Sequence, residues 1–449
     1  MRVVLLSTYD LGRQPFGLAS PAAWLKRAGF DVTCVDLSRE KLTPDVVAGA
    51  GFAAFYLPMH TATRLAMPVI ARLRAVNPSL PIAAYGLYAP LNEALLRESG
   101  VSIVLGPEAE EDLVVWAGAA GGAGRAGALP RLAFIPPDRT GLPPLDRYAS
   151  LQMPDGSSKI VGATDATRGC KHRCRHCPIV PVYDGQFRVV PVDVVMADVR
   201  AQVAGGATHI TFGDPDFFNG PTHARKLIET LHAEFPALTY DAIIKVEHLL
   251  HHRELLPVLA GTGCLFVTSA VESVDDEVLA KLEKGHTRAD FVAAAALCRA
   301  AGLTLVPTFV AFTPWTTIDS YRDLLDVVGA LDLVPNVAPV QWGIRLLVTW
   351  QSRLLELPDI RALVGPFDRT TLTFPWRHPD PRVDELQAHT MVIAGARPNG
   401  SRHEVVAQIR ALLAPEHPST SAPQHLSTSA PEHLKLRTDI PYLNEPWYC

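Results

Sequence analysis

The chain has 449 residues, of which 48% are hydrophobic, and a formal net charge of −5 at pH 7. This length exceeds what one hydrophobic core usually supports, so two domains with additional segments are expected. The weakly acidic balance lacks the basic surface of a nucleic-acid-binding protein and the polybasic segment of a membrane-bound one, and no apolar run approaches the ~20 residues of a membrane span.

Strands and helices are predicted to alternate through the first 116 residues. Apolar runs predict strands at 2–7, 31–37, 52–57, 81–85 and 101–105, and helical patterns lie at 17–28, 62–76 and 91–99. Strands linked through helices pair in parallel, so residues 1–116 are expected to form an α/β, doubly wound, Rossmann-like domain. The opening apolar run is too short for a signal peptide, which favours the cytoplasm.

The next segment, 117–158, is predicted to be a linker. Residues 117–129 are mostly Gly and Ala and indicate a flexible connection. Prolines between positions 136 and 144 indicate a stiffer path after it.

A second alternating series begins near residue 160. Strands are expected at 160–166, 209–213, 240–246, 265–270, 303–311 and 340–347, and the helical patterns between them lie at 191–204, 222–234, 252–259, 275–282, 288–301 and 318–331. Six strand–helix units predict a partial (β/α)6 TIM barrel over residues 159–350, with its site at the carboxyl ends of the strands.

Three further segments follow the predicted barrel. Residues 351–413 carry two helical patterns, at 381–394 and 402–413. Residues 414–438 repeat a Pro/Ser/Thr-rich unit with a period of eight, which is typical of a disordered tether. Residues 439–449 form an aromatic tail that ends in Cys449.

Three cysteines follow the first predicted barrel strand. Cys170, Cys174 and Cys177 have the spacing C-x3-C-x2-C. Three thiolates from one short loop can hold three corners of an iron–sulfur cube and leave the fourth iron open to chemistry. A disulfide is disfavoured because one cysteine would stay unpaired. Zinc is an alternative because His172 and His176 lie in the same loop, although structural zinc sites usually use two separated pairs.

The cysteine triplet and its lead-in, Ala163–Gly169, resemble the signature of the radical S-adenosylmethionine (SAM) superfamily. The stretches Val271-Glu272-Ser273 and 279–287 resemble the branch of that superfamily with an N-terminal cobalamin-binding-type domain. Turns at 14–18 and 106–110 resemble those of the cobalamin domain. The D-x-H-x-x-G loop that gives cobalt a histidine is missing, so bound cobalamin and a domain kept for packing or peptide recognition are both open.

The resemblance implies that Cys170, Cys174 and Cys177 ligate a 4Fe-4S cluster whose open iron binds SAM. It also implies an external electron donor of the flavodoxin or ferredoxin type. Seven residues are candidates for binding the cofactors, either because the resemblance implies this role or because they lie at the end of a predicted strand. They are Tyr183, Gly213, Asp214, Lys245, Glu272, Ser273 and Arg345. The charged members of this set can equally be ordinary salt-bridge partners.

The C-terminal end, with the whole chain before it, resembles an uncharacterised radical SAM family named for its CUAEP or CCAEP tail. This sequence stops at the first cysteine of that tail. A selenocysteine codon read as stop would explain this, and Cys449 would then be one half of a catalytic Cys-Sec redox pair. The alternative is a terminal thiol without a role.

These features predict a cytoplasmic enzyme that cleaves SAM reductively and uses the 5′-deoxyadenosyl radical to modify a small molecule or peptide. Methyl transfer through cobalamin is the alternative reaction. A protein of another class, in which the cluster only carries electrons or senses redox state, is the third interpretation.

Overall fold

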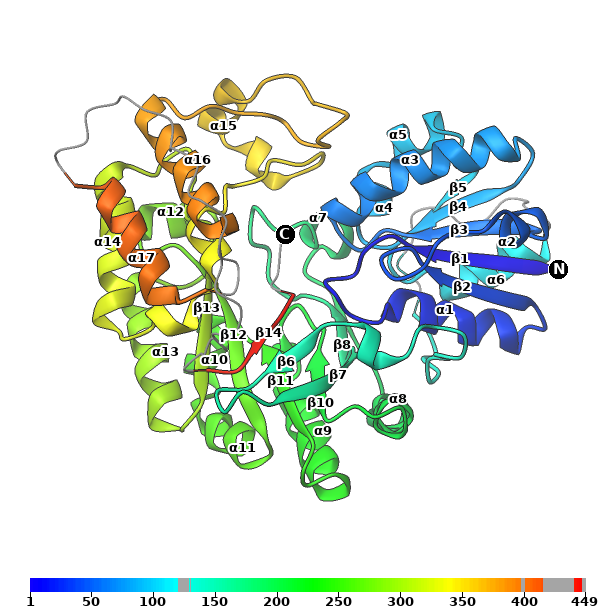
Figure 1. Ribbon diagram of the computed structural model, residues 1–449, viewed down its shortest axis with the longest axis horizontal. Coiled ribbons are helices and arrows are strands. Elements are labelled where there is room, and N and C mark those ends of the chain that lie inside the picture. Colours follow the sequence, from blue (N-terminus) through cyan, green and yellow to red (C-terminus); the bar gives the residue numbers. More distant parts are fainter. Residues whose placement is uncertain (120–128, 130, 397–399, 415–439, 446–449) are drawn as a thin grey trace, which may run out of the picture.

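The computed structural model describes residues 1–119, 129, 131–396, 400–414 and 440–445 (Figure 1). The N-terminal domain lies beside the carboxyl-terminal mouth of a second, larger α/β domain. The predicted tether beyond residue 414 and the predicted catalytic Cys449 lie outside the described residues.

Five parallel strands form the N-terminal sheet, in the order β2-β1-β3-β4-β5. They are β1 (Arg2–Ser7), β2 (Asp31–Asp36), β3 (Phe52–Tyr56), β4 (Ile82–Tyr85) and β5 (Ile103–Val104). Their apolar runs are buried on both faces because helices cover both. The doubly wound domain is therefore as predicted, and a crevice is expected at the strands' carboxyl ends, where the order changes direction beside β1.

Two layers of helices cover this sheet. On one face, α1 (Phe16–Arg27) and α6 (Glu110–Gly118) pack through Leu18 and Trp116. On the other face, α2 (Pro44–Ala48), α3 (His60–Val76), α4 (Tyr88–Leu91) and α5 (Glu93–Glu98) complete the layer.

The second domain is built on a seven-stranded sheet in the order β13-β12-β11-β10-β7-β6-β14. Its parallel strands are β7 (Ser158–Thr164), β10 (His209–Phe212), β11 (Thr239–Ile243), β12 (Cys264–Glu272) and β13 (Thr304–Phe309). The antiparallel strands β6 (Ser150–Gln152) and β14 (Tyr442–Leu443) extend the β7 edge. The sheet is therefore a curved, partial barrel rather than a closed one.

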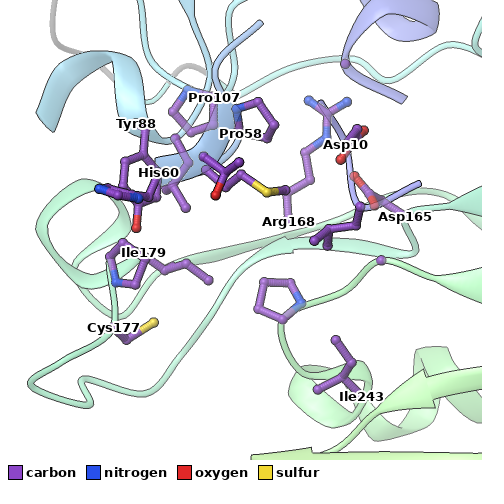
Figure 2. A pocket seen from close by; sticks show the side chains of 18 of the residues that line it. Asp10, Pro58, His60, Tyr88, Pro107, Asp165, Arg168, Cys177, Ile179 and Ile243 are labelled. Carbon is purple, nitrogen blue, oxygen red and sulfur yellow. The ribbon is translucent and has the colours of Figure 1, made fainter. Parts of the chain in front are cut away.

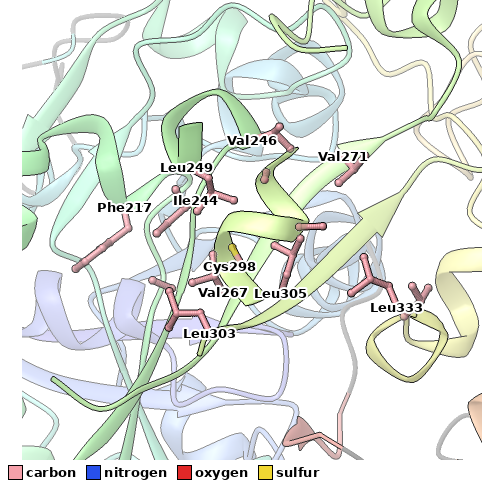
Figure 3. Close-up of a cluster of buried hydrophobic side chains, with 14 of the residues drawn as sticks. Phe217, Ile244, Val246, Leu249, Val267, Val271, Cys298, Leu303, Leu305 and Leu333 are labelled. Carbon is pink, nitrogen blue, oxygen red and sulfur yellow. The ribbon is translucent and has the colours of Figure 1, made fainter. Parts of the chain in front are cut away.

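Helices cover the outer face of this sheet. They are α8 (Val192–Ala204), α9 (Pro221–Glu234), α10 (Val246–His251), α11 (Leu256–Gly261), α12 (Asp276–Lys281), α13 (Arg288–Ala300) and α14 (Ile318–Ala330). They follow the predicted ranges, except that α10 was not predicted and the helix predicted at 252–259 is a 3-10 turn followed by α11. Figure 3 shows the apolar core between strands and helices, where Val267 and Leu305 meet Leu249 and Cys298. Cys298 is fully buried, so it is a core residue.

The prediction of a regular sixth barrel strand at 340–347 is wrong. Residues 339–342 form a short 3-10 helix, and only an isolated parallel bridge joins Arg345 to Phe312. Side-chain amides take the place of the missing ladder, because Gln341 Oε1 accepts from Phe309 N (2.9 Å) and Asn336 Nδ2 donates to Leu305 O (2.6 Å). The segment still lies in the sixth position of the barrel.

The remaining helices are α15 (Pro358–Leu363), α16 (Pro381–Ala396) and α17 (Arg402–Leu412). Val383 and Ile409, from α16 and α17, join the barrel core. Within the described ranges, none of the helices combines the length and apolar character needed to cross a bilayer.

Candidate active site

The cysteine loop lies at the carboxyl end of β7, as the barrel geometry requires. It leaves the short strand β8 (Thr167–Gly169) and runs into the single turn α7 (Val180–Tyr183). Gly169 has φ +77°, and a Cβ atom there would lie 2.4 Å from the Tyr183 ring. The loop therefore starts at a position that only glycine fits.

Two side chains from the segment that follows β10 fix the start of the loop. Asp214 is fully buried and accepts from Thr167 Oγ1 (2.5 Å) and Ala166 N (2.9 Å). Asn219 donates to Gly169 O (3.1 Å) and accepts from Lys171 N (3.2 Å). The structure thus places Asp214 beneath the loop and not among the residues that line the cavity beside it.

The three loop thiols suit a metal cluster. Cys170, Cys174 and Cys177 form no disulfide, and burial raises the pKa of Cys170 to about 11 and that of Cys177 to about 12. Thiols of this kind ionise on binding a metal. Lys245 adds positive charge, with Nζ 3.8 Å from Cys174 Sγ. Three free thiols and an adjacent cation fit a cluster of net negative charge.

A cavity of about 530 Å³ opens beside the loop (Figure 2). Both domains form its walls. The N-terminal domain contributes the ends of β1, β3 and β4, through residues such as Asp10, His60 and Tyr88. The barrel contributes Asp165 and Cys177, together with the ends of β12 and β13. Figure 2 shows Cys177 and Ile179 facing the side chains of the N-terminal domain across this space.

Glu272, at the end of β12, links the loop to the cavity wall. Its Oε1 lies 3.1 Å from His176 Nε2 and 3.3 Å from Lys284 Nζ. Burial alone would raise the pKa of Glu272, but the Lys284 charge and the His176 contact lower it to about 2. Sequence reasoning named Glu272 and missed Lys284 as its partner, although both lie in the stretches that carry the resemblance.

A buried ionic network joins the two domains at the cavity. Arg168, from β8, pairs with Glu110 (2.7 Å) and Glu108 (3.3 Å) of the N-terminal domain. Tyr183 donates its hydroxyl to Glu108 Oε1 (2.7 Å). Tyr183 therefore lies at the cavity, and its hydroxyl is held by the other domain. Sequence reasoning missed Arg168, because its partners are about 60 positions away in the chain.

The other predicted residues take different places. Gly213 lines the cavity, and a Cβ atom there would lie 2.6 Å from Asp165 Oδ1. Arg345 also lines it, with its guanidinium 3.5 Å from the Trp376 ring centroid and 2.6 Å from Asp384. Ser273 accepts from Asp275 N (3.1 Å) and is outside the cavity lining.

His60 is a histidine of the N-terminal wall of the cavity, and its Nε2 lies 2.6 Å from Thr371 O. The aromatic rings of Tyr56, Tyr85 and Tyr88 form much of the wall.

Comparison with known proteins agrees with this geometry. Residues 165–328 match the model of the Radical SAM superfamily. A tRNA-2-methylthio-N(6)-dimethylallyladenosine synthase of Pseudomonas fluorescens is 23% identical over 57% of this chain and 58% of its own length. The ribosomal protein uS12 methylthiotransferase RimO of Geobacter sulfurreducens is 24% identical over 45% of this chain and 49% of its own length. The chain thus spans about half the length of these relatives.

Two solved structures share the fold over most of the chain. The cobalamin-dependent SAM radical enzyme OxsB, with aqua-cobalamin and SAM bound, has a TM-score of 0.67 at 12% identity, covering 88% of this chain and 67% of its own. The radical SAM methyltransferase TsrM of Kitasatospora setae has a TM-score of 0.67 at 16% identity, covering 92% and 89%. The superfamily implies a 4Fe-4S cluster and SAM as cofactors. Residues 165–328 therefore form a radical SAM domain, and the chain as a whole shares its fold with these two solved structures.

Proposed function

We propose that this chain cleaves SAM reductively and modifies a small molecule or peptide held in the cavity between its two domains. The observation that carries the proposal is the position of the cysteine loop. Its three free thiols lie at the end of the first barrel strand, and Cys177 opens onto a cavity that both domains enclose.

Cys170, Cys174 and Cys177 would hold the 4Fe-4S cluster. When bound, the cluster and SAM supply the electron and the 5′-deoxyadenosyl radical that begin the reaction. An external donor of the flavodoxin or ferredoxin type is proposed as the source of the electron. Lys245, close to Cys174, offsets negative charge at the loop.

The cavity residues would bind and orient SAM. Glu272 faces the cavity, and only its Oε1 is taken by the loop partners, so its second oxygen can accept from ribose hydroxyls. Gly213 allows the backbone at the end of β10 to approach a ligand closely. Arg345 is a candidate to bind the SAM carboxylate. It now pairs with Asp384 and would have to give up that ion pair.

The domain interface would keep water from the reacting groups. Arg168 and Glu110 close one side of the cavity with a buried ion pair, and Ile179 and Leu346 add apolar wall. A dry site protects a substrate radical from quenching.

The proposal is tested with Cys174→Ser in the full-length chain. After anaerobic reconstitution and reduction, wild type should form 5′-deoxyadenosine from SAM, and the variant should form only background amounts. Cys298→Ser is the matched control, because that cysteine lies in the core and away from the loop. A wild-type chain that carries a cluster and never cleaves SAM would favour the redox or sensor interpretation instead.

Methyl transfer through cobalamin is the second candidate function. The cavity favours it, because strand ends of the N-terminal domain form a whole wall of it. OxsB and TsrM are described with cobalamin bound and share the fold of this chain. Titration of the full-length chain into hydroxocobalamin should change the visible spectrum of the corrin, and an unchanged spectrum would remove this candidate.

A further inference from the structure

Three metal-ligating side chains from three different elements meet on the loop. His172 is in the cysteine loop itself, Asp216 follows β10, and His248 lies on α10. His172 Nε2 is 3.2 Å from His248 Nε2 and 3.6 Å from Asp216 Oδ2. This group is separate from the cavity, since none of the three lines it.

The group contains buried polar atoms without hydrogen bonds. Asp216 is 0% exposed and His248 is 2% exposed. Asp216 Oδ1 accepts from Phe218 N (3.2 Å), whereas Asp216 Oδ2 and His248 Nδ1 form a close ion-pair contact (2.6 Å) that lacks hydrogen-bond geometry. A buried carboxylate oxygen favours a positive partner, and here that partner is either an imidazolium or a metal ion bound between the side chains.

Ligand atoms of the three residues lie within 4.8 Å of one another. Two ligands at 2.0–2.1 Å from a tetrahedral ion lie about 3.3 Å apart, and both distances from His172 Nε2 are close to this value. Asp216 Oδ2 and His248 Nδ1 are closer together (2.6 Å), so an ion bound by both residues would separate this pair or bind His248 through Nε2. Imidazole nitrogen and carboxylate oxygen together suit zinc and similar first-row ions. We propose that His172, Asp216 and His248 bind one divalent transition-metal ion, of which zinc is the best match, next to the cysteine loop and independent of its thiols.

Two charged side chains beside the site, Glu247 and Lys245, are placed so that a metal ion could bind there. Glu247 Oε2 lies 3.6 Å from His172 Nδ1, where a carboxylate would orient a ligating ring. Lys245 is the competing cation, but its Nζ contacts Glu247 (3.5 Å) and Cys174 (3.8 Å).

An ion at this position would tie the middle of the cysteine loop to β10 and α10. Asp214 and Asn219 already hold the first residues of the loop, so the ion would fix the stretch between Cys170 and Cys174. The alternative is a hydrogen-bonded chain in which His248 and His172 share a proton and Asp216 accepts from His248. That chain would need no metal.

The test measures metal content, not turnover. Full-length protein with a reconstituted cluster is equilibrated anaerobically with Zn²⁺, passed over a chelating resin and analysed for iron and zinc. Wild type should retain one zinc per chain in addition to the cluster iron. His248→Gln should retain less than about a tenth of that zinc and keep its iron. His251→Gln, an exposed change on the same helix, should keep both metals.

A second variant, His172→Gln, and a second metal, cobalt, test the site independently of His248→Gln. His172→Gln should also lose zinc, and its ring is on the loop, so the barrel core is untouched. Cobalt in place of zinc should give visible bands without a thiolate charge-transfer band. The proposal is overturned if cluster-loaded wild type retains no more zinc than His248→Gln, or if bound cobalt has the thiolate band and is lost in Cys174→Ser.

Discussion

At the scale of single residues, Glu272 is the position where conformation and chemistry are most closely linked. It has φ +69°, in the left-handed region that glutamate seldom occupies, at a break in the pairing of β12 with β13. Such a conformation costs about 1–3 kcal/mol and persists only where its surroundings fix it. His176 and Lys284 provide that restraint, so one carboxylate joins the cysteine loop, β12 and the turn after α12.

Glu272→Gln should destabilise the barrel because it leaves Lys284, which is 3% exposed, without its counter-ion. Breaking a buried pair from one side typically costs about 3–5 kcal/mol. We expect the thermal unfolding midpoint to fall by at least about 5 °C, measured by circular dichroism on the cluster-free chain. Glu277→Gln, exposed on α12, is the control and should leave the midpoint unchanged. Equal midpoints for the two variants would contradict the role of this pair.

The sequence could indicate the cysteines and Glu272, because each belongs to a recognisable local motif. The side chains that contact the residues of the site could not be predicted from the sequence, for a physical reason. Lys284 reaches Glu272 only after a turn with left-handed conformation at Glu283 and Gly285, and periodicity does not reveal such a turn. Similarly, His248 was not recognised as a neighbour of His172, because 76 positions separate them and the barrel closes that distance.

At the scale of elements, the strands of the sheets were predictable where apolar runs are continuous. All five parallel strands of each domain match such runs. The prediction of a sixth barrel strand failed although its apolar residues are typical of a strand. Side chains, and not a sixth strand, make hydrogen bonds to the backbone at this edge of β13. Gln341 and Asn336 satisfy β13 with side-chain amides, and nothing in local composition distinguishes an amide that caps a sheet edge from one in solvent.

The strand β14 was also unpredictable, because it pairs with β6 across 294 positions of the sequence. Leu443 packs against a small apolar cluster of Leu151, Val161 and Phe266. Asn444 accepts from Ser150 N (2.9 Å) and donates to Ser150 O (3.0 Å), and Glu445 pairs with Arg39 of the N-terminal domain (2.8 Å). The last described residues thus connect both domains.

Leu443→Asp should release this strand, because it places a charge in an apolar cluster. Hydrogen exchange by mass spectrometry should then show faster exchange of the β6 amides, by at least about tenfold if the released contact is worth ~1.4 kcal/mol or more. Tyr442→Phe keeps the ring beside Arg402 and is the matched control, with exchange expected to match wild type. Unchanged β6 exchange in Leu443→Asp would mean that β14 does not protect β6.

At the scale of the whole molecule, charged groups from both domains meet around the cavity. The connector residue Arg139 donates to Asp198 of the barrel (2.7 Å) and to Gln14 of the N-terminal domain (2.8 Å). Arg168 reaches in the opposite direction to Glu110. The domains are therefore held together by buried ionic contacts, whose strength depends on which of the nearby carboxyl groups are ionised.

Asp10 and Asp165 are the carboxyl groups whose ionisation should set this dependence. Both line the cavity, one from each domain (Figure 2). Burial raises the pKa of Asp10 to about 7, with a contribution from the Asp165 charge, and burial raises the pKa of Asp165 to about 6. An aspartate in the unfolded chain titrates near 3.9. The unfolded chain therefore loses these protons first, and the folded state becomes less stable as pH rises from about 4 to 7.

Asp10→Asn should remove one part of this pH dependence. The amide stays neutral at every pH, so the thermal midpoint of the variant relative to wild type should rise between about pH 5 and pH 8. Asp193→Asn, exposed on α8, is the control and should follow the wild-type profile. If the difference between Asp10→Asn and wild type stayed constant over this range, Asp10 would be titrating as an ordinary surface carboxylate. A rising difference would instead show that loss of the Asp10 proton makes the folded chain less stable relative to the unfolded chain, as the raised pKa of Asp10 requires.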